Sequence, residues 1–285
     1  MQSKGLAAIS VDLEDWYQGL ELPLESWGSY EKRIQIGTEV LLEIFDKNSV
    51  KATFFALGIV AKEHPKILQK IADAGHEIGS HSLFHKKIYE LTPKQFKSEE
   101  VKSKDLIEQV IGSRIFGFRA PYFSITNQSL WALEVLSELG YEYDSSISPV
   151  KTWRYGIKGV SEGIYEIENG MYEFTPSTMS VFGKKLGVGG AYMRLLPLAF
   201  TKRALSSGAR GLYLHPWELD PHHPRLNISY LPRFTHYVNL KSTKAKLSYL
   251  VETFRFLPIK AVIEAERKIK RFKPLTFDDL VQGRL

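Results

Sequence analysis

Short apolar runs alternate with amphipathic segments along most of this chain. Residues 6–11 form a mainly apolar run of strand length, as expected for a strand covered on both faces. Residues 38–48 then show helical periodicity, and residues 51–58 form the next buried strand. Further helices are predicted at residues 65–74, 92–111, 129–139, 195–205 and 241–256, and further strands at 76–79, 115–118, 141–144 and 211–214. Strands that alternate with helices predict an α/β fold with a mainly parallel sheet.

Some of the predicted helices carry clear end signals. Thr92 is a preferred N-cap residue, and Pro93 suits the first turn of the helix that follows it. Gly75 and Gly140 each follow a predicted helix, where glycine is a common stop signal.

Residues 150–192 interrupt the alternation. They are rich in glycine and tyrosine and hold two short β-like runs, residues 163–167 and 171–174, so we predict a hairpin-bearing insertion. The chain has no internal repeat and no low-complexity linker. We therefore expect one domain over residues 1–285, in which residues 219–285 form a C-terminal extension.

The composition is that of an ordinary globular protein, with 285 residues, 44% of them apolar and 25% charged. The chain has no cysteine, which excludes disulfides, thiolate metal ligands and a cysteine nucleophile. Any metal ion must therefore be bound through nitrogen and oxygen atoms.

The chain is basic, with a formal net charge of +6 and a pI near 9.2. Part of the excess lies in residues 267–271, which we interpret as the solvated face of a C-terminal helix. No nucleic-acid-reading motif accompanies this cluster, so we expect no nucleic-acid partner.

No run approaches the ~20 apolar residues that a membrane span requires. Residues 1–11 also lack the long apolar stretch and cleavage site of a secretory signal. We expect no transmembrane segment and a cytoplasmic protein, with the inner membrane surface as a place where it could work.

Polar residues recur where the predicted strands end. Asp12, His81, Arg119, Asp144 and His215 all stand at such positions. Barrel-like α/β enzymes place their sites at the carboxyl ends of parallel strands, so these residues are candidates for one shared site.

His81 and His85 are four residues apart. On a helical turn they would share one face, and two neutral imidazoles in that register can bind one metal ion. The pair alone is equally typical of a helix that happens to carry two histidines.

Three carboxylates follow the first strand, at Asp12, Glu14 and Asp15. Strand alternation puts Asp12 and Glu14 on one face and favours Glu14 as a metal ligand. A bulge would favour Asp15 instead, and both remain candidates.

Taken together, these motifs resemble the polysaccharide deacetylases of carbohydrate esterase family 4. The resemblance covers most of residues 5–220 and lies in residues 10–15, 52–55, 81–85, 119–122, 144 and 214–215. Residues 189–194, 213–218 and 233–240 look like the exosortase-associated branch, which is found with exopolysaccharide biosynthesis genes.

The resemblance implies a distorted (β/α)7-like barrel that holds one divalent metal ion, usually zinc, on a carboxylate and the two histidines. It implies hydrolysis of an N-acetyl group from an amino sugar of a polysaccharide or its precursor. Asp12 matches the general base, Arg119 the arginine that orients it, and His215 the general acid. The backbone N–H of Tyr122 would stabilise the oxyanion, and Asp144 could tune the pKa of His215.

The sequence departs from the family at two places. The first motif reads Asp-Leu-Glu-Asp over residues 12–15, which leaves the metal carboxylate open between Glu14 and Asp15. The tryptophan that often follows the family's later aspartate is absent after Asp144, and Trp217 or Trp153 could take its place.

Four residues are candidates for substrate contacts, namely Pro121, Tyr192, Trp217 and Glu218, the last of which could instead hold His215. Each site residue also has an ordinary structural interpretation when taken singly. The alternatives to a glycan deacetylase are a hydrolase of small cyclic or linear amides with the same fold and a catalytically inactive carbohydrate-binding protein.

Overall fold

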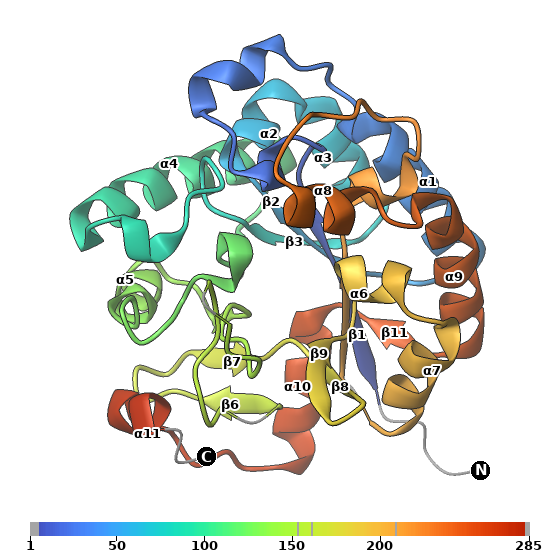
Figure 1. The fold of residues 1–285 in the computed structure, drawn as a ribbon. Coiled ribbons are helices and arrows are strands. Elements are labelled where there is room, and N and C mark those ends of the chain that lie inside the picture. The colour runs from blue at the N-terminus through green and yellow to red at the C-terminus, as the bar shows by residue number, and fades with distance from the viewer. Residues whose placement is uncertain (1–5, 153, 161, 209, 283–285) are drawn as a thin grey trace.

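The structure is a computed structural model that describes residues 6–152, 154–160, 162–208 and 210–282. Its main sheet has the strand order β10-β1-β2-β3-β4-β5-β7-β6, and Figure 1 shows that this sheet curls around the middle of the molecule. The strands are β1 (Ala7–Leu13), β2 (Thr53–Ala56), β3 (Glu77–Ser80), β4 (Gly117–Phe118), β5 (Tyr143–Asp144), β6 (Ile164–Glu166), β7 (Tyr172–Phe174) and β10 (Gly211–Leu214).

All neighbours in this order pair in parallel except β6, which is antiparallel to β7. The predicted α/β class with a mainly parallel sheet is confirmed. The sheet is a curled half-barrel, because within the described residues its end strands β10 and β6 do not pair with each other.

Helices surround the curled sheet, as Figure 1 shows. In chain order they are α1 (Ile34–Lys47), α2 (Gly58–Glu63), α3 (Pro65–Asp73), α4 (Pro93–Ile111), α5 (Trp131–Glu138), α6 (Gly190–Leu195), α7 (Leu198–Ser206), α8 (Tyr230–Tyr237), α9 (Leu240–Thr253), α10 (Ile259–Ile269) and α11 (Phe277–Gln282). The sequence prediction missed α2, α6, α8 and α11, which are only six to eight residues long and too short for a clear periodic signal.

Strand β1 lies at the centre of the fold, and all seven of its residues are buried. It pairs with β10 on one side and β2 on the other, as a strand covered on both faces requires. The short strand β11 (Phe256–Leu257) also pairs with β1, so residues from the predicted C-terminal extension add directly to the sheet.

The start of α4 has the local structure that its sequence predicts. The Thr92 side chain accepts a hydrogen bond from the Gln95 N–H, and the Thr92 N–H donates to the Gln95 side chain. This capping box satisfies N–H groups that the first helical turn leaves without partners.

The expected insertion at residues 150–192 is only partly correct. Residues 164–174 form β6 and β7, and β7 continues the main sheet beside β5. Strands β8 (Thr178–Val181) and β9 (Lys184–Gly187) form a separate antiparallel hairpin. Short β-like runs do not reveal which strand they will pair with. The sequence therefore could not show that β7 extends the main sheet while β8 and β9 form a separate hairpin.

None of the described helices combines the length and the apolar character that crossing a bilayer would need.

Candidate active site

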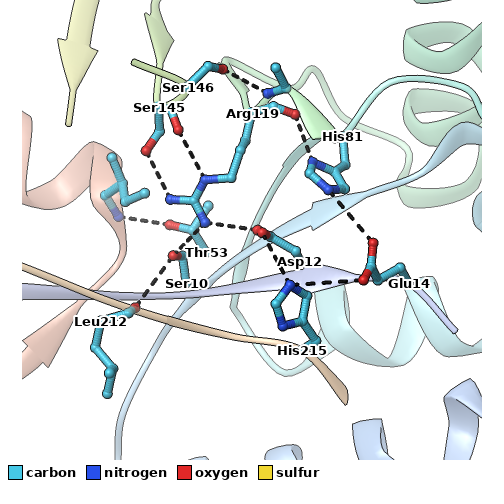
Figure 2. Close-up of polar contacts among 12 residues, drawn as sticks. Ser10, Asp12, Glu14, Thr53, His81, Arg119, Ser145, Ser146, Leu212 and His215 are labelled. Carbon is cyan, nitrogen blue, oxygen red and sulfur yellow. Dashed lines mark hydrogen bonds and ion pairs between the residues drawn. The ribbon is translucent and has the colours of Figure 1, made fainter. Parts of the chain in front are cut away.

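The strand-end residues predicted from sequence lie together at the carboxyl edge of the sheet. Parallel pairing of β1 with β10 places Asp12 beside His215. His81 directly follows β3, and Arg119 directly follows β4. Figure 2 shows these four side chains facing a common centre with Glu14.

Glu14, His81 and His85 form a buried group whose potential ligand atoms all lie within 4.8 Å of one another. Oε2 of Glu14 lies 2.6 Å from Nε2 of His85 and 4.0 Å from Nε2 of His81. This oxygen is buried and makes no hydrogen bond of good geometry. A carboxylate oxygen without a hydrogen bond, facing two imidazole nitrogens, is an arrangement that a divalent cation would satisfy.

The expected helical register of His81 and His85 is wrong. Residues 81–87 contain no helix, and the backbone turns through left-handed conformations at Ser82 (φ 69°) and His85 (φ 55°). The loop after β3 brings the two rings to a centroid separation of 5.1 Å. The four-residue spacing therefore selected this pair of histidines, but the helical turn that it implied is absent from residues 81–87.

His81 is oriented as a metal ligand needs to be. Its Nδ1 lies 2.7 Å from the backbone carbonyl oxygen of Arg119, so Nδ1 carries the proton and the Nε2 lone pair faces Glu14. Burial lowers the pKa of His81 to about 4, although the nearby carboxylates oppose this. A neutral imidazole beside a carboxylate suits zinc, which binds nitrogen and oxygen donors.

Asp15 points away from this group and stabilises the start of α1. Its carboxylate accepts hydrogen bonds from the N–H groups of Trp16 (2.8 Å), Arg33 (2.8 Å) and Ile34 (3.1 Å). Burial nevertheless raises the pKa of Asp15 to about 6. Among the two carboxylates that the sequence left open, the structure places Glu14 with the histidines.

Asp12 is held by Arg119, as the sequence analysis expected. Nη1 of Arg119 donates to Oδ1 of Asp12 at 2.8 Å, and both side chains are buried. Burial alone would raise the pKa of Asp12, but the Arg119 guanidinium and two nearby histidines hold it below its ordinary value. Oδ2 remains directed toward Nε2 of His215, 3.8 Å away.

Arg119 is itself fixed on several sides. Its side chain donates to the hydroxyls of Ser10 and Ser145 at 2.9 Å each, and its guanidinium lies over the ring of Phe55. The same residue binds Asp12 through its side chain and His81 through its carbonyl. Arg119 therefore links the carboxylate at the end of β1 to the histidine at the end of β3.

Asp144 does not lie against His215. Its carboxylate accepts hydrogen bonds from the Ser146 hydroxyl (2.5 Å) and N–H (3.0 Å), and the Ser146 hydroxyl accepts one from the Ala120 N–H. Burial raises the pKa of Asp144, and Glu173 shares its site. The structure thus makes Asp144 a support for the loop after Arg119, contrary to the expected role beside His215.

His215 has Glu218 as its buried partner. Nδ1 of His215 lies 2.8 Å from Oε1 of Glu218, and Nε2 lies 3.9 Å from Oε1 of Glu14. Burial would lower the pKa of His215, but Glu218, Glu14 and Asp12 raise it to about 9. The His215 side chain is 18% exposed, so it is the member of this group that solvent reaches most easily.

Glu218 is fixed in turn by Arg194, a residue that the sequence analysis did not select. Nε of Arg194 donates to Oε2 of Glu218 at 2.6 Å, and both side chains are almost completely buried. Burial would raise the pKa of Glu218, but Arg194 and His215 lower it below its ordinary value. With both oxygens bound inside the protein, Glu218 is placed to hold His215 rather than to contact a sugar.

Trp217 forms one wall of the site. Its indole stacks on the His215 ring (5.1 Å, 22°), and its Nε1–H donates to Oε1 of Glu14 at 3.1 Å. It also stacks on His236 from α8, with ring centroids 4.1 Å apart. Trp217 therefore positions both the proposed ligand Glu14 and His215.

Pro121 and Tyr122 form a tight turn next to the histidines. Pro121 is buried, and Tyr122 adopts a left-handed backbone conformation with φ 56°. The Tyr122 ring packs edge-on against His85, with centroids 4.5 Å apart. Strained backbone of this kind persists where surrounding packing fixes it, which is frequent at functional sites.

Tyr192 lies in α6 and interacts with Tyr155 and Tyr213. Tyr213 in turn lies edge-on to His215 at 6.2 Å, so Tyr192 belongs to an aromatic group behind the site. Trp153, the other candidate for a tryptophan wall, lies outside the described residues.

The structure adds residues that local patterns could not identify as site components, namely Ser10, Ser145, Ser146, Glu173, Arg194 and His236. Ser10, Arg194 and His236 lie inside the motifs at residues 10–15, 189–194 and 233–240, but nothing in those motifs gave them a role. Ser145, Ser146 and Glu173 lie outside every motif, and their role depends on distant parts of the chain.

The curled parallel sheet and the side chains at its carboxyl edge together indicate the class of protein. A Glu-His-His group faces an Asp–Arg pair and a third histidine, a set of side chains that suits metal-dependent hydrolysis. Residues 30–143 match the family described as polysaccharide deacetylase. Residues 145–264 match a second family, DUF3473, described as a domain of unknown function.

Curated relatives match part of the chain. A peptidoglycan deacetylase from Helicobacter pylori is 32% identical over 113 residues, 40% of this chain and 38% of that protein. A peptidoglycan-N-acetylglucosamine deacetylase from Bacillus cereus is 33% identical over 98 residues, 34% of this chain and 36% of that protein. A chitooligosaccharide deacetylase from Azorhizobium caulinodans is 30% identical over 104 residues, 36% of this chain and 48% of that protein. The matches span well under two thirds of each relative.

Solved structures share the fold. A Mycobacterium smegmatis protein assigned to the polysaccharide deacetylases superposes with a TM-score of 0.68 at 19% identity, covering 97% of this chain and 95% of that one. The peptidoglycan deacetylase PdaC from Bacillus subtilis gives 0.51 at 15% identity, with 94% of each chain covered. A CE4 family pseudoenzyme from Bacillus anthracis gives 0.51 at 14%, covering 92% of this chain and 66% of that one.

Proposed function

We propose that this protein is a metal-dependent deacetylase that removes N-acetyl groups from amino sugars of a polysaccharide or its precursor. The observation that carries this proposal is the position of Asp12 and His215 beside the Glu14-His81-His85 group, with His215 within 4 Å of both Asp12 and Glu14. The sequence relatives named above, which are deacetylases of N-acetylated glycans, support the substrate class.

Glu14, His81 and His85 would hold the divalent ion, and we propose zinc. When bound, such an ion polarises the amide carbonyl and lowers the pKa of water. Three protein ligands suit a catalytic site, because they leave a coordination position open. The expected place in exopolysaccharide biosynthesis rests on the resemblance of residues 189–194, 213–218 and 233–240 and remains a prediction.

Asp12 acts as the general base in this proposal. Arg119 binds Oδ1 and favours the ionised carboxylate, which leaves Oδ2 to accept a proton from the attacking water. The N–H of Tyr122 donates to the oxygen that gains negative charge, and one such donor is typically worth ~10²–10³ in rate.

His215 acts as the general acid. Its Nδ1 is bound to Glu218, so Nε2 is the nitrogen that gives a proton to the departing amine. The general acid and the general base therefore come from different parts of the chain. His215 lies within residues 145–264, which match DUF3473, and Asp12 precedes residues 30–143, which match the polysaccharide deacetylase family.

The test is acetate release from N-acetylglucosamine oligomers by protein that has been stripped of metal and then given zinc. We expect activity to return with zinc and to fall by at least ~10² in Asp12→Asn. His81→Ala should lose both zinc and activity. His222→Ala is the matched control, because His222 is an exposed histidine outside the site.

Two outcomes would contradict the proposal in different ways. Zinc binding without acetate release would keep the metal site and reject the glycan substrate. Absence of zinc binding would reject the metal-dependent reaction and favour a carbohydrate-binding protein without catalysis.

A further inference from the structure

Helix α8 presents an apolar surface to solvent. Tyr230 is 81% exposed, Leu231 65% and Phe234 41%, and the rings of Tyr230 and Phe234 stack with centroids 6.3 Å apart. Leu195, 42% exposed, ends α6, which packs against α8. We call these four residues the α8 patch. Single exposed apolar residues are ordinary, but several on one short helix mark an interaction surface.

The opposite side of α8 is fixed in the protein. His236 is buried and stacks on Trp217, and Arg194 donates to the carbonyl oxygens of Thr235, His236 and Val238 at 2.8–2.9 Å. These contacts prevent the helix from turning its apolar residues inward. The outer side chains therefore remain exposed although their burial would be favourable.

The part of the chain around α8 carries the positive charge of the protein. Residues 174–251 contain eleven Lys and Arg residues and two acidic residues, a formal excess of nine, whereas the whole chain carries +6. The remaining residues are therefore net acidic. Residues 174–251, about a quarter of the chain, include α6, α7, α8 and α9, which Figure 1 draws in yellow to dark orange.

Basic residues lie on α8 and in the segments before and after it. Arg225, Arg233 and Lys241 are exposed, and within the described residues none of them forms an ion pair with an acidic side chain. Residues 221–251 contain no acidic residue at all. Exposed aromatic and aliphatic side chains, in a segment that has cations and no acidic residue, match a bilayer surface with an apolar interior and anionic headgroups.

We propose that the α8 patch docks this protein onto the surface of a bilayer that contains anionic lipid. Tyr230, Leu231 and Phe234 would enter the headgroup boundary, while Arg225 and Arg233 would contact lipid phosphates. A soluble polyanion would use the cations but would gain nothing from the exposed rings. The proposal does not depend on the deacetylase reaction. If both hold, the docked face lies next to the site, because the inner side of α8 packs on Trp217.

The experiment is cosedimentation of the full chain with vesicles. One set contains phosphatidylcholine alone, and the other is an equimolar mixture of phosphatidylcholine and phosphatidylglycerol. We expect binding to the mixed vesicles only, with weaker binding when NaCl is raised from about 0.1 to about 1 M. Tyr230→Ser/Leu231→Ser/Phe234→Ser should lower partitioning about tenfold or more. Arg225→Gln/Arg233→Gln should lower it about thirtyfold.

Ile269→Ser with Lys268→Gln is the matched control. Ile269 is 80% exposed on α10 among the basic residues 267–271, so this pair also removes apolar and positive surface, but elsewhere. It should leave vesicle binding unchanged, and the melting temperature of every variant should show that the fold is intact.

Three results would overturn the proposal. Loss of vesicle binding in the control instead of the α8 variants would assign membrane contact to α10. Tight binding to soluble polyphosphate, lost in the arginine variant and unchanged in the aromatic one, would assign the surface to a polyanion. A concentration-dependent dimer that the aromatic variant dissociates would assign it to a second copy of the chain.

Discussion

Glu218 links His215 to Arg194 inside the protein. Its Oε1 lies 2.8 Å from Nδ1 of His215 and its Oε2 lies 2.6 Å from Nε of Arg194. Because Nδ1 is occupied, Nε2 faces Asp12 and Glu14 and is available for proton transfer. The Glu218–Arg194 pair also connects His215 to α8, because Arg194 donates hydrogen bonds to carbonyl groups at the end of that helix.

Glu218→Gln is therefore expected to lower kcat for acetate release about 10–100-fold while zinc binding stays normal, because supporting residues of this kind act through the group they orient. The variant leaves Arg194 buried without a charge partner, so the free energy of unfolding should fall by roughly 3–5 kcal/mol. Activity must be measured at a temperature where the variant is folded. Nitrogen chemical shifts of His215 report the change in its protonation directly, because Glu218 helps to raise the pKa of His215. Glu252→Gln, an exposed glutamate on α9, is the control, and equal kcat in both variants would contradict the role of Glu218.

Glu14 and Asp15 are adjacent but should respond differently to amide substitution. Glu14→Gln removes a proposed ligand and should weaken zinc binding by at least ~10². Asp15→Asn should keep zinc and lower the free energy of unfolding by about 1 kcal/mol, because Asp15 accepts N–H groups at the start of α1. Zinc titration and urea unfolding measure the two effects. Loss of zinc in Asp15→Asn but not in Glu14→Gln would reverse the assignment.

Gly37 tests the packing of α1 against the segment after His215. A Cβ atom at this position would lie 1.8 Å from the carbonyl oxygen of Pro216. Gly→Ala inside a helix usually raises the free energy of unfolding by up to about 1 kcal/mol. For Gly37→Ala we expect the free energy of unfolding to fall by roughly 1–3 kcal/mol instead. The kcat should fall as well, because Pro216 adjoins His215. Thermal unfolding and acetate release check both. Gly28→Ala is the control, because nothing lies within 4 Å of its Cβ position. Equal stability of the two variants would show that α1 and residue 216 can separate freely.

Glu100 should make stability depend on pH. It is fully buried against Tyr141, whose hydroxyl donates to Oε1 at 2.5 Å, and burial raises the pKa of Glu100 from 4.5 to about 7. An acid with a raised folded pKa stabilises the fold fully below its unfolded pKa, and this contribution is lost as pH rises through the folded value. Relative to Glu100→Gln, the free energy of unfolding of the wild type should fall by about 3 kcal/mol between pH 4.5 and pH 8. Urea unfolding of both proteins across this range measures the difference, and parallel curves would contradict it.

The sequence by itself determined the features that depend on neighbouring residues. Helical periodicity and the Thr92 cap predicted α4, and the apolar run at residues 6–11 predicted β1. Polar residues after such runs also located the candidate site, because the carboxyl ends of parallel strands meet at one edge.

Only the tertiary structure decided which of these residues meet. In the structure Glu14 faces the histidines and Asp15 faces α1. Residues 81–85 form a loop instead of the expected helical turn, and Asp144 accepts a hydrogen bond from Ser146. The tertiary structure also joined Arg194 to Glu218 and β7 to β5. Each of these outcomes depends on contacts between distant or differently packed segments, and a short window of sequence contains no information about the partner that a polar group or a strand edge will find.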